Sequence, residues 1–242
     1  MINIERPAQA PASLQSPKVR HYLECLAKHK QDPKQNPEPE KPSGYRNSDL
    51  LEVFDTHFFS KCYLTEQRFG SAWAMDVEHF SERPEVVFEW TNLYPADHTA
   101  NMMKWRKTPD GGYLDPCSPD DDVETEIQYA LIEFGKEPRF DSKDVGNTKA
   151  VNTSKLLHLL HNGKNNDAES ANRTKHLRTL IKTKYDEVMK ALAEWLHWRT
   201  DESRKLAAAE TLKILLSRRA SFTMLMRSID SVQDFVPKDF LD

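Results

Sequence analysis

The sequence predicts a helix-dominated α+β chain, and three observations lead to that fold class. Only 7 of its 242 residues are glycine, well below the average of ~7%, which argues against a glycine-rich nucleotide-binding fold. Apolar residues recur at helical spacing through most of the second half of the chain. Short segments rich in aromatic and β-branched residues gather between residues 62 and 115, where strands are expected.

Composition excludes several other classes of protein. The sequence contains no apolar run near the roughly 18 residues that a membrane-spanning helix needs. Its first residues lack the basic region and apolar stretch of a secretory signal. Three scattered cysteines are too few for a disulfide framework, so we expect a reducing, cytoplasmic compartment.

Residues 1–45 are expected to form an N-terminal arm and a proline-rich linker. Pro7 and Pro11 oppose regular structure in residues 1–15. Ser16 and Pro17 are typical of a helix start, and an amphipathic helix is expected over residues 17–30. Residues 32–44 hold four prolines and no apolar side chain, which predicts an extended linker. An arm with so little structure of its own would suit docking on a partner.

The next segment, residues 46–115, is expected to be a compact α+β unit. A helix capped by Asn47 or Ser48 is predicted over residues 49–62. Two short strands and a short helix are expected within residues 62–115, with the strands drawn from CYLTEQ, AWAMDVEHF and VVFEW.

Residues 116–242 are predicted to be a helical, basic C-terminal domain. Helices are expected near residues 122–135, 144–162, 167–199 and 201–229, with the acidic run 120–122 as an N-cap for the first. The long third helix has an apolar stripe that we expect to face the core: Leu177, Leu180, Ile181, Tyr185, Val188, Leu192, Trp195 and Leu196.

Charge is distributed unevenly along the chain. Residues 1–142 carry 16 Lys and Arg against 25 Asp and Glu, whereas residues 143–228 carry 17 against 9. A basic helical half can meet phosphate groups. It can equally be the solvated face of ordinary helices, and composition alone does not separate the two.

The residues that carry chemistry lie between positions 76 and 104. Glu78 and His79 form an acidic–histidine pair, Asn92 follows 13 residues after His79, and Asn101 follows 9 residues after Asn92. A carboxylate binds hard cations such as Mg²⁺ or Mn²⁺, and an amide oxygen from a following helix can complete the site. A histidine free of metal can deprotonate a water near neutral pH.

The order and spacing of the EH, WxNL and NxxK motifs resemble those of the HNH endonuclease family, which has a ββα-metal core. The resemblance implies that His79 is the general base and that Asn92 holds the loop and orients His79. It implies that Glu78 and Asn101 bind one Mg²⁺ or Mn²⁺ ion. Asp76, two residues before Glu78, is a possible further ligand.

Two basic residues and one histidine lie near the expected metal site in the sequence. Lys104 follows one turn after Asn101 and is expected to contact a phosphate of the nucleic acid. Arg83 stands near the place where the family often has a basic residue after the histidine. His98 lies close enough in the sequence to approach the metal, although its position matches no ligand of the family.

Within this family the chain most resembles the PtuB-type HNH component of Septu and retron-associated Septu-like antiviral systems. The opening MI-x-I-x-R, the run YLDPCSPDDD and the run NTSKLLHLL extend the resemblance over most of the chain. It implies an ABC-type, PtuA-like ATPase partner, a nucleic-acid substrate, DNA or RNA, in the bacterial cytoplasm, and in some systems a retron reverse transcriptase.

The chain departs from the family where a structural zinc is often bound. The two CxxC pairs are replaced by Cys62-x-x-Thr65 and Asp97-x-x-Ala100. Threonine and alanine supply no soft anionic ligand, so no structural Zn²⁺ is expected. The core would then be held by packing, with four candidates: Trp73, Phe80, Phe88 and Trp90.

The lost cysteines leave other functions open. In one, the nuclease core has decayed and the chain is an adaptor that binds the ATPase or nucleic acid. In the other, the chain is a helical regulator and its Glu78–His79 pair is accidental.

Overall fold

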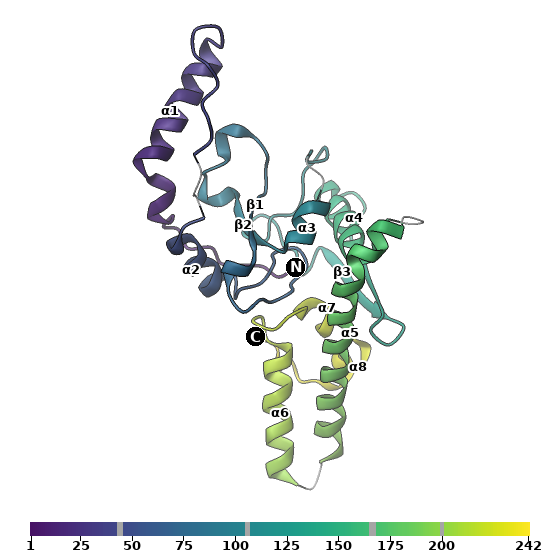
Figure 1. The fold of residues 1–242 in the computed structure, drawn as a ribbon. Helices are drawn as coiled ribbons and strands as arrows, with labels where there is room; N and C mark the ends of the chain where they lie inside the picture. The colour runs from purple at the N-terminus through teal and green to yellow at the C-terminus, as the bar shows by residue number, and fades with distance from the viewer. Residues whose placement is uncertain (43–45, 105–106, 165–167, 199–200) are drawn as a thin grey trace.

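The computed structural model describes residues 1–42, 46–104, 107–164, 168–198 and 201–242 (Figure 1). Helices dominate and the strands form small two-stranded sheets, so the expected helix-dominated α+β class is confirmed. The elements are α1 (Pro17–Gln31), α2 (Ser48–His57), β1 (Asp76–His79), β2 (Leu93–Ala96), α3 (His98–Met103), β3 (Ile127–Ile132), β4 (Glu137–Ser142), α4 (Thr148–Asn162), α5 (Ala168–His197), α6 (Glu202–Leu216), α7 (Thr223–Arg227) and α8 (Asp230–Phe235).

The N-terminal segment is part of the core of this chain. Met1, Ile2 and Ile4 are buried, and the amide of Ile4 donates to the carbonyl of Pro116 at 2.7 Å. These residues form no helix or strand, as expected, but they pack into the core of the chain instead of standing apart from it. Burial of the apolar side chains of Met1, Ile2 and Ile4 lowers the free energy of the folded chain, and it does not require regular secondary structure.

Helix α1 forms as the sequence predicts and extends away from the body of the molecule (Figure 1). The side chain of Ser16 accepts from the amide of Val19, and Pro17 is the first helical residue. The buried face of α1 packs on Val87 and Phe88, which lie in the loop between β1 and β2.

Helix α2 ends earlier than the sequence predicts. The expected span was 49–62, but the helix stops at His57. Phe59 and Ser60 have φ of 58° and 55°, a left-handed conformation that ends a right-handed helix.

Strands β1 and β2 pair antiparallel, with Asp76 opposite Ala96 and His79 opposite Leu93. Helix α3 follows β2 directly and contacts β1. Two short strands and a short helix were expected here, but VVFEW is not a strand. Val86 ends one short 3₁₀ turn and Trp90 begins another, and the second strand is Leu93–Ala96 instead.

The helix expected at 122–135 is wrong, because this region contains the β3–β4 hairpin. Ile127 and Tyr129 are buried while Gln128 between them is exposed, which is the period-two pattern of a strand. Glu133 and Phe134 have positive φ and turn the chain. The acidic run does not cap a helix: the Asp122 side chain accepts from the amides of Glu124 and Thr125 in a turn.

The structure confirms the apolar stripe that was predicted for the long third helix, α5. Helix α4 spans Thr148–Asn162, and the expected ends of the third helix, 167 and 199, lie outside the described residues. The stripe of α5 does face the core, with four members buried and the other four packed against it. The helix expected over 201–229 is interrupted after Leu216, and Phe222 has φ of 58° before α7 begins.

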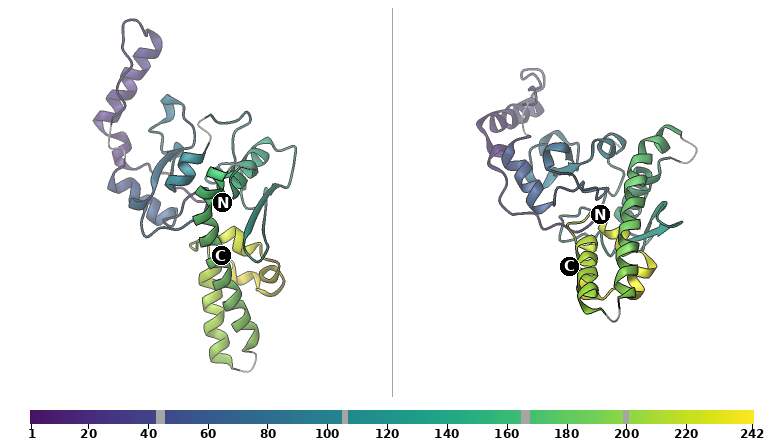
Figure 2. Two further views of the ribbon diagram at one scale, coloured as in Figure 1. Left: turned by 45° about the vertical axis from the view of Figure 1, so that its right-hand side comes forward. Right: turned by 60° about the horizontal axis from the view of Figure 1, so that its bottom comes forward.

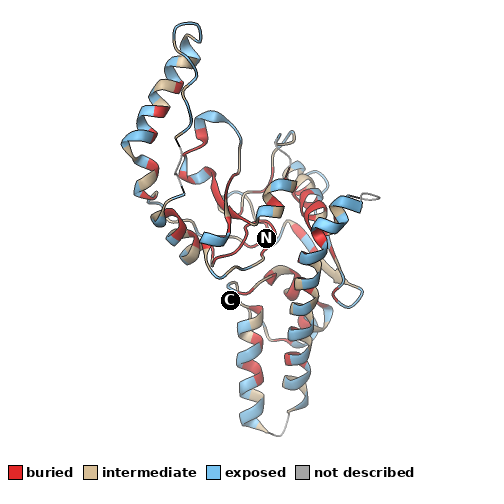
Figure 3. Cartoon of the chain, viewed as in Figure 1, coloured by how far each residue is buried: buried red, intermediate tan, exposed pale blue. Residues whose placement is uncertain are grey.

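Helices α5 and α6 pack side by side as a pair that extends from the body (Figure 2). One continuous apolar core joins residues from the N-terminal, central and C-terminal segments (Figure 3). The domain boundaries expected near residues 46 and 116 stay predictions.

Of the four aromatic residues expected to hold the core, three contribute to packing. Trp90 is buried and stacks on Phe54 at 6.0 Å between ring centroids. Phe80 is partly buried against the same core, and Phe88 is buried against α1. Trp73 is 61% exposed, so that part of the expectation is wrong. Across the described residues, none of the helices combines the length and apolar character that crossing a membrane requires.

Candidate functional site

Strand β1 sends its polar side chains in two directions. Asp76 and Glu78 alternate with Val77 and His79, so the two acids share one face of the strand. Both acids bond to side chains of α3 or of its C-cap, whereas His79 bonds to the β1–β2 loop. The two faces therefore hold different parts of the expected chemistry.

Asp76 joins two side chains of α3 at the edge of the molecule. Its Oδ2 accepts from Nδ1 of His98 at 2.8 Å and from Nδ2 of Asn101 at 3.0 Å. His98 and Asn101 share a helix face because they are three residues apart. The Asp97 side chain accepts from the amide of Ala100 and fixes the start of α3.

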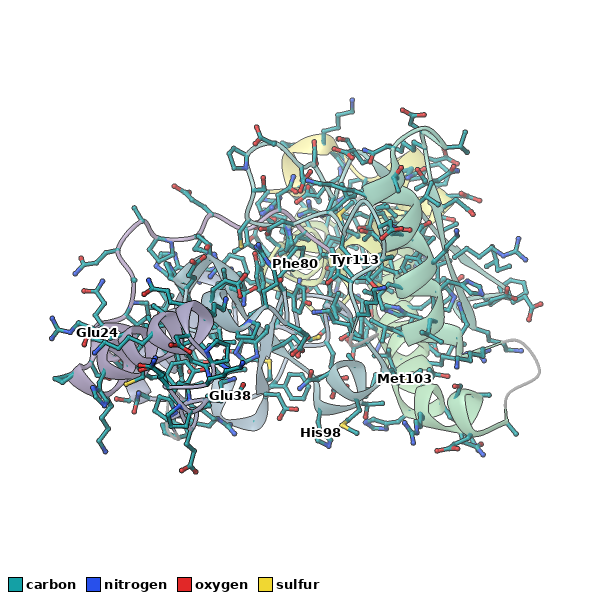
Figure 4. The ribbon with its side chains drawn as sticks, turned by 90° about the horizontal axis from the view of Figure 1, so that it is seen from above. Glu24, Glu38, Phe80, His98, Met103 and Tyr113 are labelled. Carbon is teal, nitrogen blue, oxygen red and sulfur yellow. The ribbon has the colours of Figure 1, made fainter. Side chains whose placement is uncertain are left out.

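This cluster is open to solvent on one side. The side chain of His98 is 75% exposed and that of Asp76 is 31% exposed, and Figure 4 shows His98 at an outer edge of the molecule. Burial opposes ionisation of Asp76, but the hydrogen bonds from Asn101 and His98 outweigh it and lower the pKa of its carboxyl. Asp76 is therefore an anion at the pH at which divalent cations bind carboxylates.

Glu78 has a different partner from the one expected. Its Oε1 accepts from Nζ of Lys104 at 2.7 Å, and both side chains are buried. Lys104 also donates to the carbonyl of His79 at 2.7 Å. The expected phosphate contact of Lys104 does not fit this arrangement, because the ammonium group lies inside the protein.

His79 is held by the loop that connects β1 and β2. Its Nε2 lies 3.1 Å from the carbonyl oxygen of Val87. A carbonyl oxygen only accepts, so Nε2 carries the proton and the lone pair of the neutral ring is on Nδ1. Burial, followed by the charge of Lys41, lowers the pKa of His79 and favours this neutral ring.

Asn92 holds both ends of this loop. Its Oδ1 accepts from the amide of Ser81 at 2.6 Å, and its Nδ2 donates to the carbonyls of Ser81 at 2.9 Å and Val86 at 3.0 Å. Val86 precedes the residue that bonds His79. The loop-holding contact that the sequence predicts for Asn92 is therefore present.

Arg83 lies on the exposed side of the same loop. Its Nε donates to the hydroxyl of Ser81 at 3.2 Å. Its expected role at nucleic acid stays a prediction. The structure thus brings Asp76 and Asn101 together and pairs Glu78 with Lys104. His79, at the end of β1, and Asn92 both bond to the β1–β2 loop.

The sequence motifs gave no role to His98, and they did not indicate its contact with Asp76. The positions of these two residues in the β1–β2–α3 unit account for the contact. His98 begins the helix that follows β2, and Asp76 is the residue paired with the end of β2. A side chain at that helix start reaches the first residue of β1.

The positions Cys62, Thr65, Asp97 and Ala100 also lie close together. Thr65, Asp97 and Ala100 line one small cavity of about 40 Å³, and the Cys62 thiol accepts from the amide of Thr65 at 3.5 Å. These side chains do not fit a zinc ion. They offer one thiol whose pKa is raised by burial, and the Asp97 carboxylate is engaged as a helix cap.

The Asp76 edge fits a hard cation better. A carboxylate and an amide oxygen are ligands suited to Mg²⁺ or Mn²⁺, and here the Asp76 carboxylate lies within hydrogen-bonding distance of the Asn101 amide. In the described part of the chain, no three side chains of His, Cys, Asp or Glu gather into a metal-binding group. A cation here would therefore depend on the Asn101 amide and on water.

In comparisons with known proteins, no family model, curated protein or solved structure matches the chain.

Proposed function

We propose that the chain is a metal-dependent endonuclease that hydrolyses phosphodiester bonds of nucleic acid, with β1, β2 and α3 as an HNH-type ββα-metal core. The single observation that carries the proposal is the setting of His79. Its ring is oriented by the carbonyl of Val87 in the β1–β2 loop. Asn92 stabilises that loop by donating to the carbonyls of Ser81 and Val86. A histidine fixed in one tautomer is suited to act as a base.

In this proposal each residue has a distinct task. His79 takes a proton from the attacking water, and Asn92 keeps His79 in place through the loop. Asp76 and Asn101 hold the cation, and His98 orients the Asp76 carboxylate. When bound, Mg²⁺ or Mn²⁺ supplies positive charge that stabilises the phosphoryl group and the leaving oxygen.

Glu78 enters this proposal as a ligand only when Lys104 moves. Its carboxylate already has an ammonium partner at 2.7 Å, and a cation would replace that positive charge. Burial raises the pKa of Glu78, and the charge of Lys104 offsets only part of that effect.

The biological setting is proposed from the sequence motifs alone. It is an antiviral complex in the bacterial cytoplasm with an ABC-type ATPase, in some systems together with a retron reverse transcriptase. No described contact identifies these partners.

The test is a cleavage assay with Mg²⁺ or Mn²⁺ on plasmid, single-stranded DNA and tRNA, with and without the ATPase. We expect His79→Ala to abolish cleavage and EDTA to do the same. His21→Ala is the matched control, because His21 lies exposed on α1 and should retain full activity. Undiminished cleavage by folded His79→Ala protein would refute the base assignment.

A non-catalytic adaptor is the second candidate, and the Glu78–Lys104 pair is the observation that favours it. A lysine buried against the expected ligand is what a decayed metal site would contain. If the wild-type protein with its ATPase cleaves none of the three substrates in either metal, the adaptor function replaces the nuclease.

A further inference from the structure

A basic groove runs along α5, on a part of the molecule that the candidate site does not use. It has a volume of about 450 Å³ and is lined by Lys136 from the β3–β4 turn together with residues of α5. The lining side chains include four cations and no carboxylate: Lys136, Lys175, Arg178 and Lys182. Figure 1 shows α5 beside the hairpin that supplies Lys136.

Most of this positive charge is available to a ligand. In the part of the chain that the structure describes, neither Lys136 nor Lys175 has a carboxylate partner. Arg178 uses Nε and Nη2 to donate to the carbonyl of Lys136 at 3.3 and 3.2 Å, which fixes its guanidinium without neutralising it. Lys182 alone is paired, with Asp186 one turn away.

The spacing of the cations matches a polyphosphate chain. Lys175, Arg178 and Lys182 share one helix face because they are three and four residues apart. Seven residues of helix cover about 10.5 Å, and the phosphates of one strand of a duplex rise by about 3.4 Å each. The span of the three side chains therefore corresponds to about three phosphate steps along the axis of a duplex that lies parallel to α5.

We propose that this groove binds the phosphodiester backbone of a nucleic acid. The identity of this polyanion rests on the proposed nuclease function. Contacts with phosphates carry no sequence information, so we expect binding without sequence preference.

Helix α5 also reaches the neighbourhood of the candidate site. Arg173 and His176 line the small cavity that Thr99 and Ala100 of α3 line from the other side. One rigid helix thus borders α3 near its start and carries the groove along its following turns. A nucleic acid held along α5 is kept close to α3 when it binds.

The experiment measures binding without cleavage, in EDTA, by fluorescence anisotropy with labelled single-stranded RNA, single-stranded DNA and duplex DNA. The groove variant carries Lys175→Gln, Arg178→Gln and Lys182→Gln. The control variant carries Lys28→Gln, Lys155→Gln and Lys190→Gln, which remove the same charge from exposed positions elsewhere.

We expect the groove variant to lose at least tenfold in affinity at low salt. Its slope of log K against log salt should fall by about 2–3, while the control slope should stay near that of the wild type. A preference among the three probes identifies the nucleic acid.

Equal weakening in the two variants would overturn the groove assignment, since net charge alone would then explain binding. Unchanged binding by the groove variant would overturn it as well. A protein that binds through the groove but never cleaves leaves this inference standing and contradicts only the nuclease proposal.

Discussion

The buried pair of Glu78 and Lys104 gives the sharpest test of how the candidate site is built. The side chains are 7% and 5% exposed, so removing one partner leaves the other charge without compensation inside the protein. Breaking a buried pair typically costs about 3–5 kcal/mol. We therefore expect Lys104→Met to lower the unfolding free energy by about that amount, and the melting temperature by roughly 6–20 °C.

The assay is urea unfolding at neutral pH, with Lys30→Met as the control. Lys30 pairs with Glu85 at 2.9 Å, but these side chains are 49% and 46% exposed, so the control should lose less than about 1 kcal/mol. The double variant with Glu78→Gln should recover most of the loss, because no buried charge then stays unpaired. If Lys104→Met costs no more than Lys30→Met, the reasoning from burial is refuted.

The same variant tests whether Glu78 can hold a cation. With Lys104 gone, Mn²⁺ can take the place of the ammonium group, and ligand binding to the folded state raises the melting temperature. We expect Mn²⁺ to stabilise Lys104→Met more than it stabilises the wild type. An equal response of the two proteins would remove Glu78 from the ligand set.

Three further outcomes follow from single residues. Burial lowers the pKa of His161 to about 4, so the stability that its neutral form preserves is complete above about pH 6.5 and is lost as the pH falls toward 4. His161→Leu should flatten the stability profile in that window by about 3 kcal/mol in urea unfolding. Asn92→Ala removes three loop bonds and should cost about 3 kcal/mol and most of any cleavage activity; wild-type kcat would contradict its positioning role. Gly163→Ala should destabilise by about 1–3 kcal/mol, because φ is 74° and the new Cβ would lie 2.8 Å from the Ala171 nitrogen, whereas Gly70→Ala meets nothing within 4 Å and serves as the thermal-melt control.

Local signals predicted the elements whose cause is local. Ser16 and Pro17 mark the start of α1, and the apolar stripe of α5 identifies its core face, because capping and periodicity act within a few turns of chain. The hairpin after residue 126 depends on contacts that are not local. A short apolar run fits a helix and a strand equally well, and packing of Tyr129 and Phe140 decides between them.

At the candidate site, the sequence by itself determined that Asp76 and Glu78 share one face of a strand and that Lys104 follows one turn after Asn101, because strand alternation and helix spacing follow from chain geometry. The loop-holding role of Asn92 came only from the family resemblance. Only the tertiary structure decided that Lys104 turns inward onto Glu78 and that His98 reaches Asp76. Those contacts join residues 22 and 26 positions apart, and which side chains meet over such distances is set by how α3 packs against β1.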